Sequence, residues 1–403
     1  MKTHSTGLDV MRGIGIFFVL VLHTAFYFYH DIYDVDLDNP TPVITVIGFL
    51  LMFAGLFAMI SGIVNTLQTA RRLEHNTPKP YRHLMTSGVI LLVIAYLYFI
   101  VTGPGIIHFD ERRMDESILV ALINHGSVTG VSLDRILYID SLVMLSVNMI
   151  LLGILFKVIG RRLLDVRTAP MILIGATLFM ALSYVRIPLY ATYIHAFDDG
   201  KMGTVLLLNV FVNKNNPVFP FFAFALFGAW IGLLLHHGKT KTLKKHGIIT
   251  ALAFIVIGAA GYVLAPETML ERMIDPTWYF IMVIQVGLFI ALVLLALRLD
   301  RKERKKGPVV RFFSRYGVAG LTPFFLESVV SALIFLLVNL VVRFEPSIPG
   351  AILYGLVLAL LWGLFLIFWE KREYRYGLEW VRASILAKTG TSSKLETLSG
   401  DRQ

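Results

Sequence analysis

Ten apolar segments, each long enough to cross a membrane, constrain this chain more than any other feature of its sequence. A helix rises about 1.5 Å per residue, so about 20 apolar residues cover a hydrocarbon layer of roughly 30 Å. Hydrophobic residues make up 56% of the 403 and charged residues only 16%, unlike a soluble domain. The sequence therefore predicts an all-α, polytopic integral membrane protein. The segments lie at about 10–29, 43–68, 84–102, 136–157, 169–186, 218–236, 247–265, 277–297, 318–341 and 350–369.

The charges between these segments predict which side of the membrane each connection faces. The connections on the side of the two termini, with the termini themselves, hold 29 of the 37 Lys and Arg residues, and the opposite connections hold eight. By the positive-inside rule both termini are cytoplasmic, in what we expect to be the cell (plasma) membrane. This asymmetry in the lipid bilayer accounts for the net charge of +10, so the charge gives no reason to expect a nucleic-acid partner.

Residues 1–383 are expected to form a single transmembrane helical domain. The short polar segment that follows, 384–403, is predicted to be a disordered cytoplasmic tail, because it has few residues that could build a core. Two outer connections, about 103–135 and 187–217, contain apolar runs at 118–123 and 205–212 that are too short to span. These runs are either interfacial or re-entrant pieces over an outward cavity, or loop structure packed on the bundle.

Arg12 and His23 are both placed on the first apolar segment. Eleven helical steps make almost three turns, so the two side chains fall on one helix face, about 16 Å apart along the axis. The guanidinium would then lie near one membrane surface and the imidazole past the middle of the hydrocarbon layer. Because burying an ionisable side chain there is costly, we interpret His23 as a candidate functional residue.

Few other polar residues are predicted inside the membrane. Asp140 lies near the outer end of the fourth segment and Glu327 inside the ninth, and neither has a basic neighbour on its own helix. Each is expected to face the bundle interior, either in a functional role or as a structural hydrogen bond between helices. In the outer connections, His125 and His195 are either substrate contacts or solvated side chains.

Asp9, Arg12 and Gly13 open the first apolar helix, and His23 follows Arg12 after ten intervening residues. This opening resembles the transmembrane acyltransferase superfamily, in which an Arg, ten residues and a His mark the acyltransferase type 3 family. The heparan-alpha-glucosaminide N-acetyltransferase family belongs to the same superfamily. Four further stretches resemble the superfamily: FAMISG at 57–62, NPVFPFFAFALFG at 216–228, GVAGLTPFFLES at 317–328 and YGLEW at 376–380. The last two of these are most similar to the bacterial relatives of the heparan enzyme.

The resemblance implies an enzyme that uses acetyl-CoA or another acyl-CoA as its co-substrate. The acyl group would pass from cytoplasmic CoA to a hydroxyl or amine of a sugar, glycan or lipid-linked acceptor at the outer face, with a transmembrane His as general base. In the heparan branch an asparagine usually replaces His23 and the essential histidine lies further outward, so His30 is the second candidate. Transfer is either direct or through an acyl-histidine intermediate.

Basic residues near the cytoplasmic surface are the candidates for binding the phosphates of CoA. Arg12 shares the helix face of His23, and the connection 298–315 contains eight Lys or Arg residues, among them Arg311 and Arg315. Two alternatives stay open. Arg12 pairs with Asp9 merely to fasten the helix start, or the connection only sets orientation or binds anionic lipid.

The remaining roles are assigned to the two intramembrane carboxylates. Asp140 is expected to fix the tautomer of the catalytic histidine, and Glu327 to bind substrate. The chain has no cysteine, which excludes disulfides, cysteine metal sites and cysteine thioesters, and no metal is predicted. Two other classes remain open, a proton-coupled secondary transporter with a path through His23, Asp140 and Glu327, and a non-catalytic membrane scaffold. A homodimer is compatible with each class.

Overall fold

The computed structural model describes residues 5–36, 40–51, 53–109, 111–128, 130–265, 274–301 and 307–389. Within them the regular structure is helical apart from one antiparallel hairpin of β1 (Ile106–His108) and β2 (Arg113–Asp115), which confirms the predicted all-α membrane class. Nine helical stretches among these residues are long and apolar enough to cross a membrane. They are Thr6–Phe28, Pro80–Thr102, Leu133–Leu164, Thr168–Asp198, Val218–His236, Thr240–Leu264, Pro276–Ala296, Leu321–Asn339 and Ile348–Glu370.

One of the ten predicted segments is not a single spanning helix. The segment predicted at 43–68 forms two helices, α2 (Pro42–Leu51) and α3 (Ala54–Glu74). With ten residues, α2 is too short to cross the hydrocarbon layer, and polar and basic residues fill the second half of α3. Nine candidate spans among the described residues agree with the expected number of about ten.

The helices belong to two compact units, and each unit is assembled from stretches that are far apart in the sequence. The first contains Met1–Met52, Val93–Tyr138 and Leu299–Val381, and the second contains Phe53–Leu92, Ile139–Arg298 and Arg382–Gln403. Two helices, α4 (Pro80–Leu97) and α17 (Leu378–Lys388), contribute residues to both. Besides α2 and the hairpin, the first unit has α1 (Thr6–Phe28), η1 (Ile32–Asp34), η2 (Tyr98–Thr102), α5 (Ile118–His125), α6 (Leu133–Leu137), η5 (Leu299–Arg301), α14 (Pro308–Ala319), α15 (Leu321–Asn339) and α16 (Ile348–Glu370).

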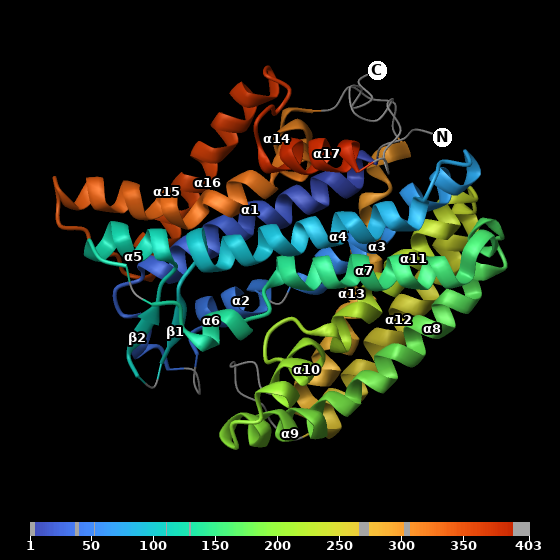
Figure 1. Ribbon diagram of the computed structural model, residues 1–403, viewed down its shortest axis with the longest axis horizontal. Helices are drawn as coiled ribbons and strands as arrows, with labels where there is room; N and C mark the ends of the chain where they lie inside the picture. Colours follow the sequence, from blue (N-terminus) through green and yellow to red (C-terminus); the bar gives the residue numbers. More distant parts are fainter. Residues whose placement is uncertain are drawn as a thin grey trace. The chain divides into compact units, whose positions relative to one another are not determined.

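In the first unit α1 packs against α14, α15 and α16 (Figure 1). Their shared core is formed by Phe17, Leu20, Val21, Tyr316, Ala319, Ala359 and Leu366. Two glycines let the backbones of α1 and α14 touch: a Cβ on Gly13 would collide with the carbonyl oxygen of Phe313, and one on Gly317 with that of Asp9. Small residues at a helix contact give this close approach in membrane proteins, and here it brings Arg12 against α14.

The second unit is built around α11 (Val218–His236), which packs against α3, α7, α8 and α12. Gly62 of α3 and Gly228 of α11 allow a close crossing, because a Cβ on either would collide with the backbone of the other helix. Both glycines lie in stretches that carry the sequence resemblance. The other elements of this unit are α7 (Ser141–Ile159), η3 (Gly160–Leu164), α8 (Thr168–Leu182), η4 (Ser183–Val185), α9 (Arg186–Asp198), α10 (Met202–Val212), α12 (Thr240–Leu264) and α13 (Pro276–Ala296).

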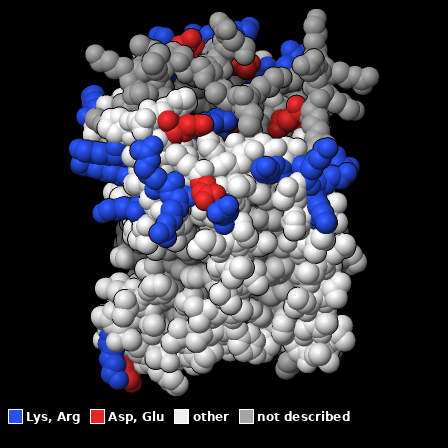
Figure 2. Space-filling view, turned by 90° about the vertical axis from the view of Figure 1, so that its right-hand side faces the viewer, with Lys and Arg blue, Asp and Glu red and all other residues white. Residues whose placement is uncertain are grey.

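Exposed apolar side chains form stripes on helices of the second unit. On α8, Met171, Ile174, Leu178 and Leu182 recur every three or four residues, and each is more than half exposed. A helix face of this kind is stable against lipid tails but not against water. Figure 2 shows such an uncharged area beside a group of Lys and Arg side chains. The stripe therefore supports a membrane-embedded chain.

Three predicted connecting or terminal segments are partly helical. The apolar runs at 118–123 and 205–212 lie in the short helices α5 and α10, neither of which is long enough to span. Helix α17 continues to Lys388, inside the segment 384–403 that was predicted to be a disordered tail. Residues 390–403 lie outside the described part of the chain, so the tail and the extent of the single domain stay predictions.

The predicted orientation can be tested directly because the chain contains no cysteine. We expect Asp31→Cys, in the first outer connection, to react with a membrane-impermeant thiol reagent added to intact cells. Lys241→Cys, at the start of α12, should react only after the membrane is permeabilised. Labelling of Lys241→Cys alone in intact cells would reverse the proposed topology.

Candidate active site

His23 lies against a buried carboxylate. Its Nδ1 is 2.6 Å from Oε1 of Glu327 on α15, and the side chains of Glu327 and His23 are 2% and 27% exposed. When a carboxylate faces Nδ1, the neutral imidazole carries its proton there, and Nε2 keeps the lone pair that can accept a proton. A carboxylate orients the catalytic histidine of Ser-His-Asp hydrolases in the same way. The geometry thus suits His23 to general-base chemistry.

Tyr98 binds the same carboxylate oxygen. Its hydroxyl donates to Oε1 of Glu327 at 2.7 Å, and the side chain is buried. Tyr98 begins η2, a π-helical turn that follows α4, and such turns are frequent at functional sites. The rings of Tyr98 and His23 both pack on Phe324, with centroids 4.8 and 5.9 Å from it. Residues from α1, η2 and α15 therefore meet around a single carboxylate.

The environment of Glu327 explains why these contacts are needed. A carboxylate that is buried without donors costs several kcal/mol, and two donors converge on Oε1. The second oxygen, Oε2, receives no hydrogen bond from the described residues. The carboxylate is thus fixed on one side by His23 and Tyr98.

Arg135 of α6 fixes the turn that carries Tyr98. This arginine is 1% exposed and donates to the carbonyl oxygens of Phe99, Pro104 and Asp115, the second of these at 3.2 Å. Its guanidinium lies 4.8 Å from the ring centroid of Phe99 and pairs with the carboxylate of Asp115. Because a π-helical turn leaves carbonyl groups without regular helical partners, these donations stabilise the turn and the position of Tyr98.

Arg12 lies at the start of α1 and braces α14. Its Nη2 donates to the carbonyl oxygen of Gly317 and is 3.4 Å from Oδ1 of Asp9. The side chain is 35% exposed, and its Nε has no hydrogen-bond partner among the described residues. Arg12 therefore makes the predicted pair with Asp9 and braces α1 against α14.

The two other predicted CoA-binding residues lie one turn apart on α14. Arg315 is paired with Glu370 of α16, with Nε 2.9 Å from Oε2. Arg311 is exposed and forms no ion pair within the described residues. The other basic residues of the connection 298–315 lie mostly at 302–306, outside the described part of the chain. The placement of Arg311 and Arg315 leaves their role as a prediction.

Asp140 and His30 have different surroundings. Asp140 belongs to the second unit, where its Oδ1 accepts from the backbone N–H of Val143 and caps α7 at 2.7 Å. The predicted role of Asp140 in fixing the tautomer of the catalytic histidine stays a prediction. His30 follows α1, its side chain is 55% exposed, and among the described residues its Nε2 lies 3.6 Å from Oδ1 of Asp31. Its geometry provides no buried partner that would fix a tautomer.

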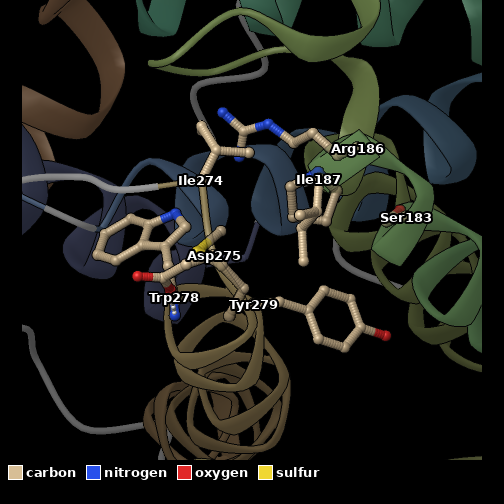
Figure 3. A pocket seen from close by; sticks show the side chains of 9 residues that line it. Ser183, Arg186, Ile187, Ile274, Asp275, Trp278 and Tyr279 are labelled. Carbon is tan, nitrogen blue, oxygen red and sulfur yellow. Dashed lines mark hydrogen bonds between the residues drawn. The ribbon is translucent and has the colours of Figure 1, made fainter. Parts of the chain in front are cut away.

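A small pocket in the second unit lies between α13 and the junction of α8 and α9 (Figure 3). Its polar groups serve helix ends and loops: Arg186 donates to backbone carbonyls at 213 and 214, the Tyr279 hydroxyl donates to the Met180 carbonyl, and Asp275 caps α13. The pocket is therefore not a candidate active site.

Sequence reasoning found His23 and Glu327, considered Glu327 either as a partner of His23 or as a substrate-binding residue and chose the second, and it missed Tyr98 and Arg135. In the sequence, Tyr98 is one aromatic among many in an apolar helix, and nothing there marks it as a carboxylate ligand. Arg135 did leave a signal, because it is one of the few basic residues in the predicted outer connections. An isolated basic residue beside an apolar segment is a candidate for a buried brace.

The comparison with protein families agrees with the resemblance in the sequence. A family profile described as an acyltransferase domain matches residues 5–317, which include Arg12, His23 and Tyr98. Glu327 lies ten residues beyond the matched range. No curated protein matches the chain. With nine candidate spans among its described residues and a family match over most of its length, the chain belongs to the acyltransferase 3 family of membrane-embedded transferases.

Proposed function

We propose that this protein transfers an acyl group, in the first instance acetyl, from cytoplasmic acyl-CoA to a hydroxyl or amine acceptor at the outer membrane face. The observation that supports this proposal most is the His23–Glu327 pair inside a chain of the acyltransferase 3 family. A neutral imidazole with Nδ1 held by a carboxylate is the arrangement that a general base needs. A sugar, glycan or lipid-linked acceptor is consistent with a site that is reached from outside.

The proposed reaction requires one base and no covalent enzyme intermediate. Nε2 of His23 takes the proton from the acceptor hydroxyl or amine as the acceptor atom attacks the thioester carbonyl. The carbon–sulfur bond then breaks, and the imidazolium returns the proton to the departing thiolate of CoA. Glu327 stabilises the positive imidazolium between the two steps, while Tyr98 holds the carboxylate in place. Acyl transfer through His23 itself would use the same nitrogen.

The donor is proposed to enter from the cytoplasmic side. Arg12 lies on the same helix as His23, about 16 Å away along the axis, and an extended acyl-pantetheine arm can cover such a distance. Arg12, Arg311 and Arg315 are the basic residues proposed to attract the CoA phosphates. Of the three, Arg12 has the most direct connection to the site, since it contacts Gly317 on the chain segment that leads into the helix of Glu327.

Removing the proposed base should abolish most of the activity without unfolding the protein. We expect His23→Ala to lower the rate of CoA release from acetyl-CoA by about 100-fold to 10,000-fold, the usual contribution of a general base. Glu327→Gln keeps the size of the side chain but loses the negative charge, and we expect a loss of at least about 100-fold in the same assay. Thermal unfolding of each purified variant shows whether the fold is retained.

His30→Ala is the matched control, because this histidine is at the end of the same helix but is exposed. We expect His30→Ala to retain most of the activity. Loss of activity in His30→Ala with normal activity in His23→Ala would move the base outward to His30. Normal activity in both variants would refute the mechanism.

Arg12→Ala tests the donor site. We expect it to weaken binding of acetyl-CoA by about 10-fold to 100-fold, the value of a hydrogen bond to a charged group, measured by titration of the purified protein. Asp9→Asn is the control, because it removes the partner of Arg12 but leaves the guanidinium. If both variants lose thermal stability equally and neither changes acetyl-CoA affinity, Arg12 is only a structural brace.

A further inference from the structure

A second polar cluster surrounds the carboxylate of Glu116 in the first unit. The hydroxyl of Tyr27 donates to Oε1 of Glu116, and the Asn124 amide donates to that same oxygen and to the Tyr27 hydroxyl, both at 2.8 Å. Nε2 of His125 lies 3.0 Å from the other oxygen, Oε2, which receives no hydrogen bond of good geometry from the described residues. The Glu116 side chain is only 10% exposed, whereas that of His125 is 59% exposed.

The cluster lies close to the proposed base along α1. Tyr27 follows His23 by four residues, so it shares the helix face and lies about 6 Å further along the axis, in the direction away from Arg12. The hairpin closes over Tyr27, because a Cβ on Gly105 would lie 2.9 Å from its ring. Glu116 itself directly follows Asp115, which Arg135 fixes. A buried carboxylate is thus held in position one turn beyond the base.

The cluster is not needed to attach α5 to its neighbours. Val120 of α5 is fully buried against Phe28 of α1 and Ala332 of α15, so apolar contacts already hold this helix. The polar residues at its end, Asn124 and His125, are instead exposed. A buried carboxylate oxygen that lacks a hydrogen bond and lies beside exposed polar side chains is the feature expected of a ligand site.

We propose that Tyr27, Glu116, Asn124 and His125 form the subsite that binds the hydroxyl groups of a saccharide-like acceptor. Three potential donors stand around one carboxylate, so a matching ligand must both donate and accept hydrogen bonds. A sugar hydroxyl does both, whereas an ammonium group only donates hydrogen bonds. A neighbouring hydroxyl of the same ligand would then reach Nε2 of His23. This part of the proposal rests on the proposed function.

The experiment uses the full chain, purified, with acetyl-CoA as donor and methyl glucoside as the acceptor probe. Release of CoA is measured without the probe and at increasing probe concentrations, and acetylated glucoside is detected by mass spectrometry. We expect a saturable increase with methyl glucoside. In Glu116→Gln and His125→Ala, the half-saturating concentration of methyl glucoside should rise at least tenfold. The rate of acetyl-CoA hydrolysis without methyl glucoside should change by a smaller factor. Glu111→Gln, an exposed carboxylate paired with Arg113 on the same hairpin, should behave as the unaltered protein.

Each outcome decides the proposal. A half-saturating concentration that stays unchanged in both cluster variants overturns the subsite, as does the absence of any response to methyl glucoside in an unaltered protein that hydrolyses acetyl-CoA. Saturation by methylamine in place of methyl glucoside overturns the hydroxyl class. If Glu116→Gln does not fold, His125→Ala still tests the subsite, because its side chain is at the surface. A failure of the proposed acyltransferase function gives a different result: the unaltered protein does not hydrolyse acetyl-CoA, or His23→Ala hydrolyses it at the same rate.

Discussion

The buried carboxylate of Glu327 is the constraint on which the site depends. Inside a membrane-spanning helix an unpaired carboxylate is one of the most costly groups that a protein can bury, so its partners must be held closely. His23 and Tyr98 supply two donors to the same oxygen, and they come from α1 and from the π-helical turn η2. The need to satisfy one charge thereby ties together segments that are up to 304 residues apart in the sequence. The same carboxylate also sets the tautomer of the histidine, so a structural requirement and a chemical one are met by a single contact.

The packing of α1 makes this contact possible. Arg12 meets Gly317 near the end of α14, and His23 meets Glu327 on α15, so α1 contacts both helices in turn. Direct backbone contact at Gly13 and Gly317 fixes the register at one end, and the histidine–carboxylate pair fixes it at the other. A side chain larger than hydrogen at either glycine would separate the helices and pull His23 away from Glu327.

The sequence was sufficient for the membrane class, for the approximate number of spans and for singling out His23 as a candidate. Hydropathy and helical periodicity are local, so they identify α1 and place Arg12 and His23 on one face. They overestimated the second span, because apolar residues continue across the boundary between α2 and α3. They offered both Asp140 and Glu327 as carboxylates that orient His23 or bind substrate, and could not choose between them. Which carboxylate meets a histidine is decided by tertiary packing, and a single sequence contains no record of it. Tyr98 and Glu116 were missed for the same reason, since neither differs in its local sequence from an ordinary aromatic or loop residue.

Two adjacent residues of the hairpin connect the histidine–carboxylate pair to the second polar cluster. Asp115 binds Arg135, which fixes the turn of Tyr98 and thus one donor to Glu327, while Glu116 binds Tyr27 on the helix of His23. Both sets of contacts end at His23. The first reaches it through Glu327, which binds its imidazole, and the second through Tyr27, which lies on the same helix. A displacement of the short strand β2 would therefore change both the orientation of the proposed base and the position of the proposed acceptor subsite. Catalytic groups perform best when their supports are rigid, and here Arg135, 1% exposed and bonded to three carbonyls, provides that rigidity. In the proposed mechanism, a buried arginine thus supports the position of the base without touching it.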